Sequence, residues 1–329
     1  MKGKILVTAR SFRATAGPHQ QTLLDAGYEI VNSPYERPLE AHELAALITD
    51  VVGAILGLDE VTADVIAQAR RLKVISRYGV GVDSIDLKAA TEHGVVVTTT
   101  PGANSVAVAE LTMGLLLALA RHIPYHDRAV KQGEWGRAQG IELAGLTLGV
   151  VGLGQIGQLV ARLAAGFGMR VLYYDPFPPA QEVVDALGVS SRSLEALLAE
   201  SDVISLHLPL TDETRNLIDQ AALELMKPSA LLINTARGGI VDEQALYEAL
   251  SAGRLAGAAC DVFLKEPPGE SPLLGLDNFV ASPHAGSATR QTTLRMGMMA
   301  SQNALAVLQG RRPAHVANPE VYARGLLKP

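Results

Sequence analysis

The stretch Gly152-Leu153-Gly154-Gln155-Ile156-Gly157 carries three glycines in the spacing GxGxxG. A short apolar run at residues 146–151 precedes it and predicts a buried parallel strand. Residues 158–167, which follow it, have apolar side chains at helical spacing. In a strand–turn–helix unit the first glycine permits a tight turn, the second lets the backbone approach a pyrophosphate, and the third lets helix and strand pack closely. The stretch therefore predicts a dinucleotide-binding turn.

An acidic residue follows at the position that such a turn requires. A second predicted strand, Arg170–Tyr174, ends at Asp175. This acid lies 18 residues beyond Gly157 (175 − 157), close to the spacing of about 20 that is expected for a ribose-binding acid. A carboxylate there accepts hydrogen bonds from a ribose 2′-hydroxyl and repels a 2′-phosphate. The sequence therefore predicts that NAD is the cofactor and is preferred to NADP.

Composition and charge limit the class of protein. A length of 329 residues suggests about two domains. A chain with 48% hydrophobic and 19% charged residues can bury a sizeable core. The net charge of −6 argues against a nucleic-acid partner.

The single cysteine and the apolar segments bear on the compartment. Cys260 excludes an intramolecular disulfide and lies in an apolar stretch, so we expect a buried thiol in a reducing compartment. The first residues lack the apolar region of a signal peptide, and residues 111–120 are too few to span a bilayer. We therefore expect a cytoplasmic protein without a membrane partner.

Strands alternate with helices along most of the chain, which predicts an α/β fold with two Rossmann-like, doubly wound parallel sheets. The expected strands are residues 4–8, 28–31, 54–56, 74–76, 95–98, 146–151, 170–174, 203–206, 231–234, 256–261 and 279–281. The expected helices are residues 16–26, 39–48, 62–69, 86–92, 105–120, 122–132, 158–167, 194–199, 243–252 and 287–308.

The order of these elements predicts the domain organisation. The last helix follows the complete dinucleotide unit, and its simplest route is a return to the N-terminal unit. We expect an NAD-binding domain at 103–286 inserted into a substrate-binding domain at 1–102 plus 287–329, with a cleft between them.

Polar residues follow several strands of the predicted nucleotide domain, where ligands bind in open α/β sheets. Reduction of a 2-oxo acid needs a hydride, a proton for the carbonyl oxygen and a fixed cation for the carboxylate. Arg237 suits the carboxylate, and His284 is the natural proton carrier near neutral pH. Glu266 would orient the ring of His284 and favour its protonated form.

The motifs together resemble those of the D-isomer-specific 2-hydroxyacid dehydrogenases, and most of all the 3-phosphoglycerate dehydrogenase branch that lacks a regulatory domain. The resemblance covers nearly the whole chain. The motifs that carry it are residues 76–83, 104–110, 152–157 with Asp175, 208–210, 234–243, 261–267 and 282–286.

This resemblance implies further site residues. It implies that the backbone of Val80 and Gly81 holds the substrate carboxylate, that Asn104 faces the cleft, and that similar proteins are homodimers joined through their nucleotide domains. It also implies contacts to NAD from Gly152, Gly154, Gln155, Ile156 and Gly157 in the glycine turn, and from Asp175, His207, Pro209, Thr235, Ala236 and Asp261 beyond it.

The sequence leaves the identity of the substrate side chain undecided. Arg77 and Arg137 stand where 3-phosphoglycerate dehydrogenases bind a phosphate, which would place the protein in serine biosynthesis. The loop after the third strand, which often supplies another Arg in that branch, reads Leu56-Gly57-Leu58. Hydroxypyruvate, glyoxylate or another short 2-oxo acid therefore remains an alternative substrate.

Other functions remain possible beside the dehydrogenase. An NAD(H)-sensing binding protein could share the fold, and so could a structural oligomer with an idle nucleotide site. The complete set of Arg237, Glu266 and His284 favours the enzyme. The remaining histidines have no metal-ligand spacing with one another or with Cys260, so we expect no metal.

Overall fold

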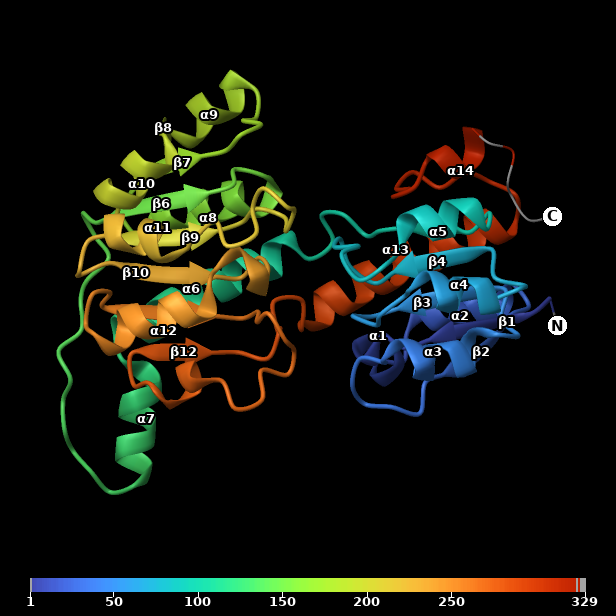
Figure 1. Ribbon diagram of the computed structural model, residues 1–329, viewed down its shortest axis with the longest axis horizontal. Helices are drawn as coiled ribbons and strands as arrows, with labels where there is room; N and C mark the ends of the chain where they lie inside the picture. Colours follow the sequence, from blue (N-terminus) through green and yellow to red (C-terminus); the bar gives the residue numbers. More distant parts are fainter. Residues whose placement is uncertain (1, 324, 326–329) are drawn as a thin grey trace. The chain divides into compact units, whose positions relative to one another are not determined.

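The computed structural model describes residues 2–323 and residue 325. The chain divides into two compact units, the first formed by Met1–Asn104 with Ala288–Pro329 and the second by Ser105–Ser287. Each unit is built on its own β-sheet flanked by helices (Figure 1). This confirms the predicted α/β class with two parallel sheets, one unit being inserted into the chain of the other.

The first unit contains a five-stranded parallel sheet in the order β2-β1-β3-β4-β5. Ile5 of β1 pairs with Ile30 of β2 on one side and with Gly53 of β3 on the other. Strands covered on both faces are mostly apolar. Every residue of β3 and β4 is buried, including Ser76 and Arg77 at the end of β4. The strands are β1 (Lys4–Val7), β2 (Glu29–Asn32), β3 (Gly53–Leu56), β4 (Val74–Arg77) and β5 (Val96–Thr98).

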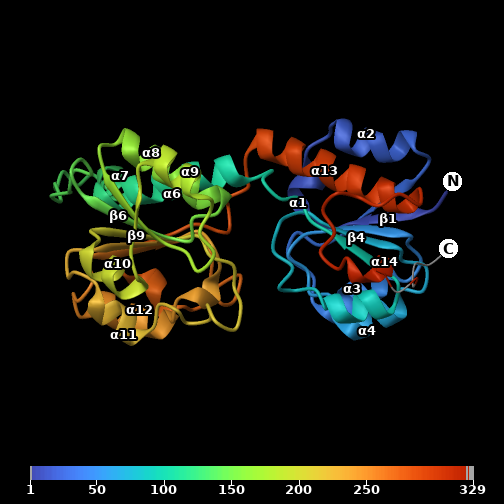
Figure 2. The ribbon, with the colours of Figure 1, turned by 90° about the horizontal axis from the view of Figure 1, so that it is seen from above.

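Helices cover both faces of this sheet (Figure 2). Ile5 packs with Phe12 and Met296 on one face, whereas the next residue, Leu6, packs with Leu44 on the other, as the two-residue period of a strand requires. The helices of the first face are α1 (Arg10–Ala14), α2 (Pro18–Asp25) and α13 (Arg290–Leu308). Those of the second are α3 (Ala41–Ile48), α4 (Ala63–Gln68) and α5 (Leu87–Glu92), and α14 (Glu320–Ala323) contacts α5.

The segment after α13 lies along the edge of β5. Val316 forms an antiparallel bridge with Thr98, and the amide of Ala317 donates to the carbonyl of Val97 at 2.8 Å. The buried side chain of Asn318 accepts from the amide of Val97 at 2.8 Å and donates to the carbonyl of Val95 at 2.9 Å. The tail therefore satisfies backbone groups that the sheet edge would otherwise leave open.

The second unit contains a seven-stranded parallel sheet in the order β12-β11-β10-β9-β6-β7-β8. The strands are β6 (Thr147–Val151), β7 (Arg170–Tyr174), β8 (Ser190–Ser191), β9 (Val203–Leu206), β10 (Leu231–Asn234), β11 (Gly257–Cys260) and β12 (Phe279–Ala281). On one face lie α6 (Ser105–Ala120), α8 (Gln155–Gly166) and α9 (Gln181–Leu187), with α7 (Ile123–Lys131) following α6. On the other lie α10 (Leu194–Glu200), α11 (Gln220–Leu225), α12 (Glu243–Ser251) and the short 3-10 helices η1 (Gly238–Ile240) and η2 (Pro272–Gly275).

The apolar helix α6 is a core helix of the second unit. Met113, Leu116 and Leu119 pack against the sheet together with residues of α8. Within the described residues, no single helix is long and apolar enough to cross a membrane. The pair α6 and α7 meets that test only jointly, with a bend of 62° between them.

Several helices differ from the expected bounds by a few residues, for example α13, which begins at Arg290 rather than at 287, and two of the differences affect the order of elements or the site. The helix expected at 16–26 is α2, and the separate helix α1 precedes it. The helix expected at 158–167 begins earlier, because α8 starts at Gln155 with Gly154 as its N-cap. The third glycine of the fingerprint therefore lies in the first turn of α8.

Candidate active site

The three glycines of the fingerprint differ in the space around them. A Cβ on Gly152, whose φ is +99°, would lie 2.8 Å from the backbone of His207. A Cβ on Gly157 would lie 2.0 Å from the carbonyl oxygen of Gly152. A Cβ on Gly154 would meet nothing within 4 Å. The first and third glycines are therefore required by packing, whereas the second leaves open space at the N-terminus of α8.

The backbone amides at the start of α8 border this space. The N-cap Gly154 has no side chain to cap them, and the amides of a helix's first turn have no partner within the helix. Gln155 is exposed and Ile156 is half-buried. The site therefore offers the oriented amides and the partial positive charge that a pyrophosphate requires.

Asp175 lies directly beside the glycine turn. One carboxylate oxygen accepts a hydrogen bond from the amide of Leu153 at 2.7 Å, and the other accepts from the amide of Phe177 at 2.7 Å. Each oxygen can accept a further bond. The fold thus brings the acid and the glycine turn together, and Asp175 keeps capacity for the hydroxyls of a ribose.

His207 follows β9 on the other side of the glycine turn. Its Nε2 lies 2.8 Å from Oγ of Ser205, and its buried Nδ1 has no hydrogen-bond partner in the described part of the chain. Burial lowers the pKa of His207 to about 3, so the ring is neutral near pH 7. Pro209, two residues further, is exposed.

The side chain of Asn234, the last residue of β10, shapes the turn that follows this strand. The amide group of Asn234, which is buried, donates to the carbonyl of Arg237 at 2.8 Å and accepts from the amide of Ala236 at 3.0 Å. Thr235 is buried, and its hydroxyl lies 2.8 Å from that of Thr112 in α6. Asn234 therefore fixes the backbone of the turn from which the half-buried side chain of Arg237 extends.

Arg237 and Glu266 belong to two loops that are locked together. A Cβ on Gly238 would lie 2.0 Å from the backbone of Phe263, so these two backbones are in direct contact. Glu243 accepts a hydrogen bond from the amide of Leu264 at 2.5 Å and closes the same junction. The loop that contains Glu266 is thus positioned by the residues that follow Arg237.

Glu266 and His284 form a pair. Oε2 of Glu266 lies 2.7 Å from Nδ1 of His284, and Oε1 of Glu266 accepts from the amide of Phe263 at 3.1 Å. The other ring nitrogen of His284, Nε2, carries no hydrogen bond within the described residues. A histidine held in this way by a carboxylate can give or take a proton at Nε2.

Asp261 supports the loop that contains His284. Its side chain is 1% exposed. One oxygen accepts from the hydroxyl of Ser282 at 2.6 Å and the amide of Ala285 at 2.7 Å, and the other accepts from the amide of Gly286 at 2.8 Å. A contact between Asp261 and NAD stays a prediction, whereas its support of the His284 loop is direct.

The candidate substrate residues of the first unit lie at the end of β4 and in the loops after β4 and β5. Val80 is 48% exposed, Gly81 and Asn104 are half-buried, and Arg77 at the end of β4 is 5% exposed. Nε of Arg77 donates to the carbonyl of Gly81 at 2.8 Å, and Nη1 donates to the carbonyls of Tyr78 and Leu56 at 3.2 and 3.3 Å. Arg77 therefore lies beneath the loop rather than on its surface.

Arg137, the other arginine considered for a phosphate, lies in the exposed stretch after α7. Within the described residues its guanidinium has neither an ion-pair nor a hydrogen-bond partner. The two arginines thus belong to different units and have opposite environments.

A buried carboxylate that the sequence analysis did not single out organises the loop after β3. Asp59 accepts from the hydroxyl of Thr8 and from the amides of Gly57 and Leu39, the last two at 2.9 Å. Leu58, which lies between Gly57 and Asp59 in the chain, is exposed. No sequence motif pointed to Asp59, because two of its partners, Thr8 and Leu39, are remote in the chain.

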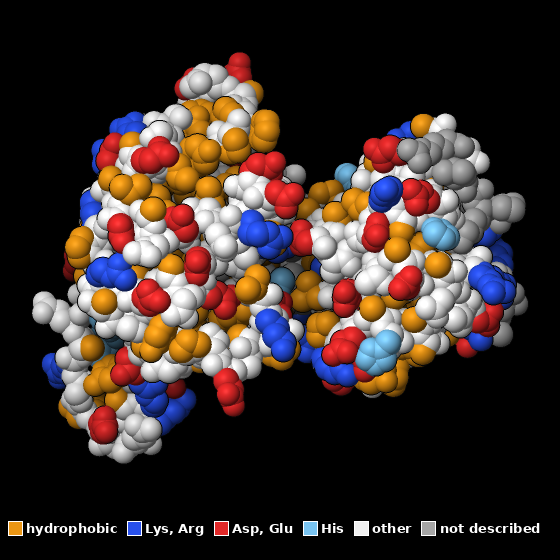
Figure 3. Space-filling model, in the orientation of Figure 1, with side chains coloured by type: hydrophobic (Ala, Val, Ile, Leu, Met, Phe, Trp, Pro, Cys, Tyr) orange, Lys and Arg blue, Asp and Glu red, His pale blue; other side chains and the backbone are white. Residues whose placement is uncertain are grey.

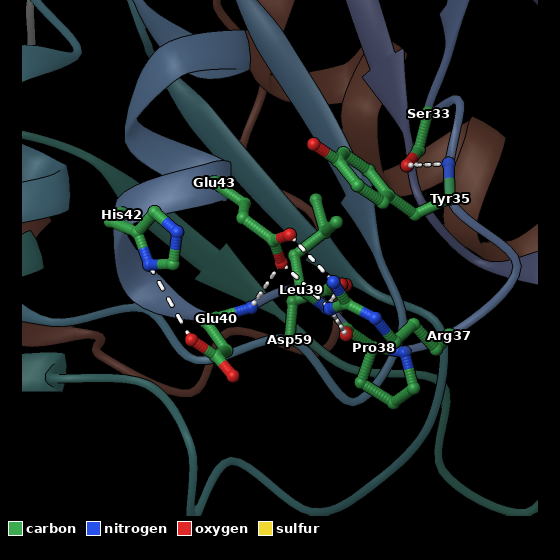
Figure 4. A network of polar contacts seen from close by, with 9 residues as sticks. All are labelled: Ser33, Tyr35, Arg37, Pro38, Leu39, Glu40, His42, Glu43 and Asp59. Carbon is green, nitrogen blue, oxygen red and sulfur yellow. Dashed lines mark hydrogen bonds and ion pairs between the residues drawn. The ribbon is translucent and has the colours of Figure 1, made fainter.

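Polar contacts continue from Asp59 to the start of α3 (Figure 4). Arg37 binds both oxygens of Glu43, at 2.7 and 2.6 Å, which lowers the pKa of Glu43 to about 2. Glu40 and Glu43 form a capping box at the N-terminus of α3. This network fixes the segment between β2 and α3, next to the Gly57-Leu58 loop.

The remaining candidate groups are structural. Cys260 is buried, and burial raises the pKa of its thiol. Among residues 2–323 and 325, no group of three or more His, Cys, Asp or Glu side chains is placed to hold a metal ion. On the face drawn in Figure 3, acidic and basic side chains are interspersed in each unit.

The second unit has the fold and the turn geometry of a dinucleotide-binding α/β domain with a glutamate–histidine pair at the carboxyl edge of its sheet. Residues 113–286 match the model of the D-isomer specific 2-hydroxyacid dehydrogenase, NAD binding domain. The chain therefore belongs to the D-isomer specific 2-hydroxyacid dehydrogenase family and contains that family's NAD-binding domain.

Individual relatives differ in their named activities. A D-3-phosphoglycerate dehydrogenase of Methanocaldococcus jannaschii is 48% identical over 82% of this chain, which spans only 52% of that relative's length. A glyoxylate reductase of Aeropyrum pernix is 46% identical over 88% of this chain and 87% of its own. The crystal structure of the TT0316 protein from Thermus thermophilus superposes with a TM-score of 0.86 at 43% identity, covering 95% of this chain and 99% of that one.

Proposed function

We propose that the protein is an NAD-dependent dehydrogenase that interconverts a D-2-hydroxy acid and its 2-oxo acid. The observation that carries the proposal is the Glu266–His284 pair, whose Nε2 is open at the sheet edge where the glycine turn also lies. We assign NAD binding to residues 103–286 and substrate binding to 1–102 with 287–329.

The residues of the glycine turn fit NAD. The space before Gly154 and the amides at the start of α8 suit the pyrophosphate, and Asp175 suits the ribose while repelling a 2′-phosphate. The unpartnered Nδ1 of His207 is a further polar atom beside this turn. Bound NADH would supply the hydride for the carbonyl carbon.

The protein's own groups would bind the acid and move the proton. Arg237 and the Val80–Gly81 backbone would hold the carboxylate. In the direction of reduction, Nε2 of His284 gives a proton to the substrate's oxygen while Glu266 stabilises the imidazolium. In the oxidative direction the neutral imidazole takes the hydroxyl proton, with Glu266 fixing its tautomer.

For the substrate we propose a 3-phosphoglycerate-like acid, which would place the reaction in serine biosynthesis. The relationship to the M. jannaschii enzyme supports this substrate, and the exposed Arg137 offers a cation for a phosphate. A hydroxypyruvate or glyoxylate reductase is the second candidate. The apolar Leu58 after β3 and the relationship to the A. pernix enzyme support it.

A substrate panel tests these proposals. NADH oxidation would be measured with phosphohydroxypyruvate, hydroxypyruvate, glyoxylate and pyruvate, and NADPH would serve as the cofactor control. A kcat/KM at least tenfold higher for phosphohydroxypyruvate, about 1.4 kcal/mol, would support the first candidate. A preference for glyoxylate or hydroxypyruvate would support the second. NADH binding without turnover of any 2-oxo acid would point to an NAD(H)-sensing protein instead.

We also propose a homodimer joined through the second unit. Apolar side chains are exposed along α7 and the stretch that follows it, including Trp135, which is 79% exposed. Glu142 in the same stretch is exposed as well. A dimer mass by analytical ultracentrifugation that falls to a monomer mass in Trp135→Asp would support this interface, whereas a wild-type monomer would reject it. The cytoplasmic location favoured by the sequence stays a prediction.

A further inference from the structure

The loop Tyr78–Gly81 is folded around the side chain of Arg77. The guanidinium group donates to the carbonyls of Gly81, Tyr78 and Leu56 at 2.8, 3.2 and 3.3 Å. A Cβ on Gly79, whose φ is +153°, would lie 3.4 Å from Cζ of Arg77. The loop thus turns its carbonyl oxygens toward a buried cation.

This arrangement determines where the amides of the loop point. In a trans peptide the N–H and the C=O point in opposite directions. Because the carbonyls of Tyr78 and Gly81 face Arg77, the amides of Gly79 and Val82 face away from it. The carbonyl of Gly79 accepts from the amide of Thr100 at 2.9 Å. The amide of Val80, which belongs to the same peptide plane, therefore points away from Thr100.

These amides are also unpaired. Within residues 2–323 and 325, the backbone N–H groups of Gly79, Val80, Gly81 and Val82 donate no hydrogen bond. Successive open amides in a loop form a concave site that suits an anion. The loop therefore has the donors for a carboxylate. Arg77 fixes the peptide planes at both ends of this run of amides, those of Gly79 and Val82.

We propose that Arg77 is a positioning residue that keeps the loop 79–82 in its carboxylate-binding form. This inference rests on the proposed function and refines it. Arg77 then acts on the carboxylate that all 2-oxo acids share, rather than on a phosphate that only some of them carry. Its rigid planar fork donates to three carbonyls from two separate nitrogens, whereas a lysine offers its three donors from one ammonium nitrogen.

The test uses Arg77→Lys and Arg77→Met with the substrate panel at saturating NADH. We expect KM to rise about tenfold or more for phosphohydroxypyruvate, hydroxypyruvate and glyoxylate alike, with a smaller change in kcat. The dissociation constant for NADH stays unchanged. Arg137→Met is the matched control, and any effect it has would be confined to phosphohydroxypyruvate.

A second variant reaches the same loop without removing the arginine. Gly79→Ala adds a Cβ at a positive φ, against the guanidinium, and should also raise KM for all three substrates. If circular dichroism shows that Arg77→Met does not fold, the KM values of Gly79→Ala are used in its place.

Three results would overturn the inference. An effect of Arg77→Lys and Arg77→Met on phosphohydroxypyruvate alone would make Arg77 a phosphate ligand. Unchanged KM values in folded variants would show that the loop does not depend on it. A wild-type protein that reduces no 2-oxo acid would remove the proposed function and this inference with it.

Discussion

The carboxylate of Glu266 lies 2.7 Å from Nδ1 of His284 and is held on its other side by the amide of Phe263. The pair is therefore oriented by the backbone before any substrate binds. His284 itself has a φ of +52°, and its amide donates to the carbonyl of Asp261 at 2.8 Å. Such pre-organisation is what a proton transfer at Nε2 requires.

Glu266→Gln keeps the shape of the pair but removes its charge. We expect kcat for 2-oxo acid reduction to fall about 10²-fold, because an amide does not stabilise the imidazolium and can favour the wrong tautomer. In His284→Ala the kcat should fall at least as far. NADH titration by fluorescence is the control and should give wild-type affinity for both variants. Near-wild-type turnover in His284→Ala would contradict the proposed mechanism.

Asp175→Ala tests the choice of cofactor. We expect NADH affinity to fall about tenfold and the preference over NADPH to shrink, because the variant neither binds the ribose nor repels a 2′-phosphate. Asp175→Asn is a useful control, since its carbonyl oxygen can still accept from the amide of Leu153. An unchanged ratio of NADH to NADPH affinity in the alanine variant would exclude the assigned role.

The glycine turn offers a matched pair of substitutions. Gly157→Ala places a Cβ 2.0 Å from the carbonyl oxygen of Gly152 and should lower the free energy of unfolding by about 2–4 kcal/mol. Gly154→Ala meets no atom within 4 Å and should fold normally. It should nevertheless weaken NADH binding about tenfold or more, because its methyl group fills the space for the pyrophosphate. Urea unfolding and NADH titration of both variants separate packing from binding. Equal stability of the two would contradict this division.

His207 predicts a specific dependence of stability on pH. Its pKa is lowered by burial to about 3, whereas an exposed histidine titrates near about 6.5. Between these values the unfolded chain binds a proton at His207 that the folded chain does not, so the free energy of unfolding falls as the pH falls. We expect about 2 kcal/mol of this loss between pH 7 and pH 5.

His207→Gln should remove that part of the slope. Glutamine still offers polar atoms to the hydroxyl of Ser205 but does not titrate. Urea unfolding of both proteins at pH 7 and pH 5, without NADH, gives the difference in slope. Identical slopes would mean that His207 is protonated as readily in the folded chain as in the unfolded one.

Much of the fold follows from local patterns. The strands β7, β9, β10 and β12 have the predicted bounds, because each is a short, mostly apolar run bounded by turn residues. The helix α6 also has its predicted bounds. The short elements α1, α9, β8 and α11 were not predicted, since their few apolar residues carry little periodic signal and are stabilised by the sheet against which they pack.

By itself, the sequence determined the two-sheet α/β class, the dinucleotide turn with its acid, and the types of side chain that end each strand. Those features are local, because a strand, a glycine turn and the residue that follows them are read within one segment. Only the tertiary structure decided which of these side chains lie together and which are used to support a loop. It placed Asp261 beneath the His284 loop and Arg77 beneath the Tyr78–Gly81 loop, and it brought Glu266 and His284, which the sequence predicted as partners, to 2.7 Å. The burial and the hydrogen-bond partners of Asp261 and Arg77 depend on segments remote in the chain. The spacing of residues along the sequence therefore could not show these supporting roles.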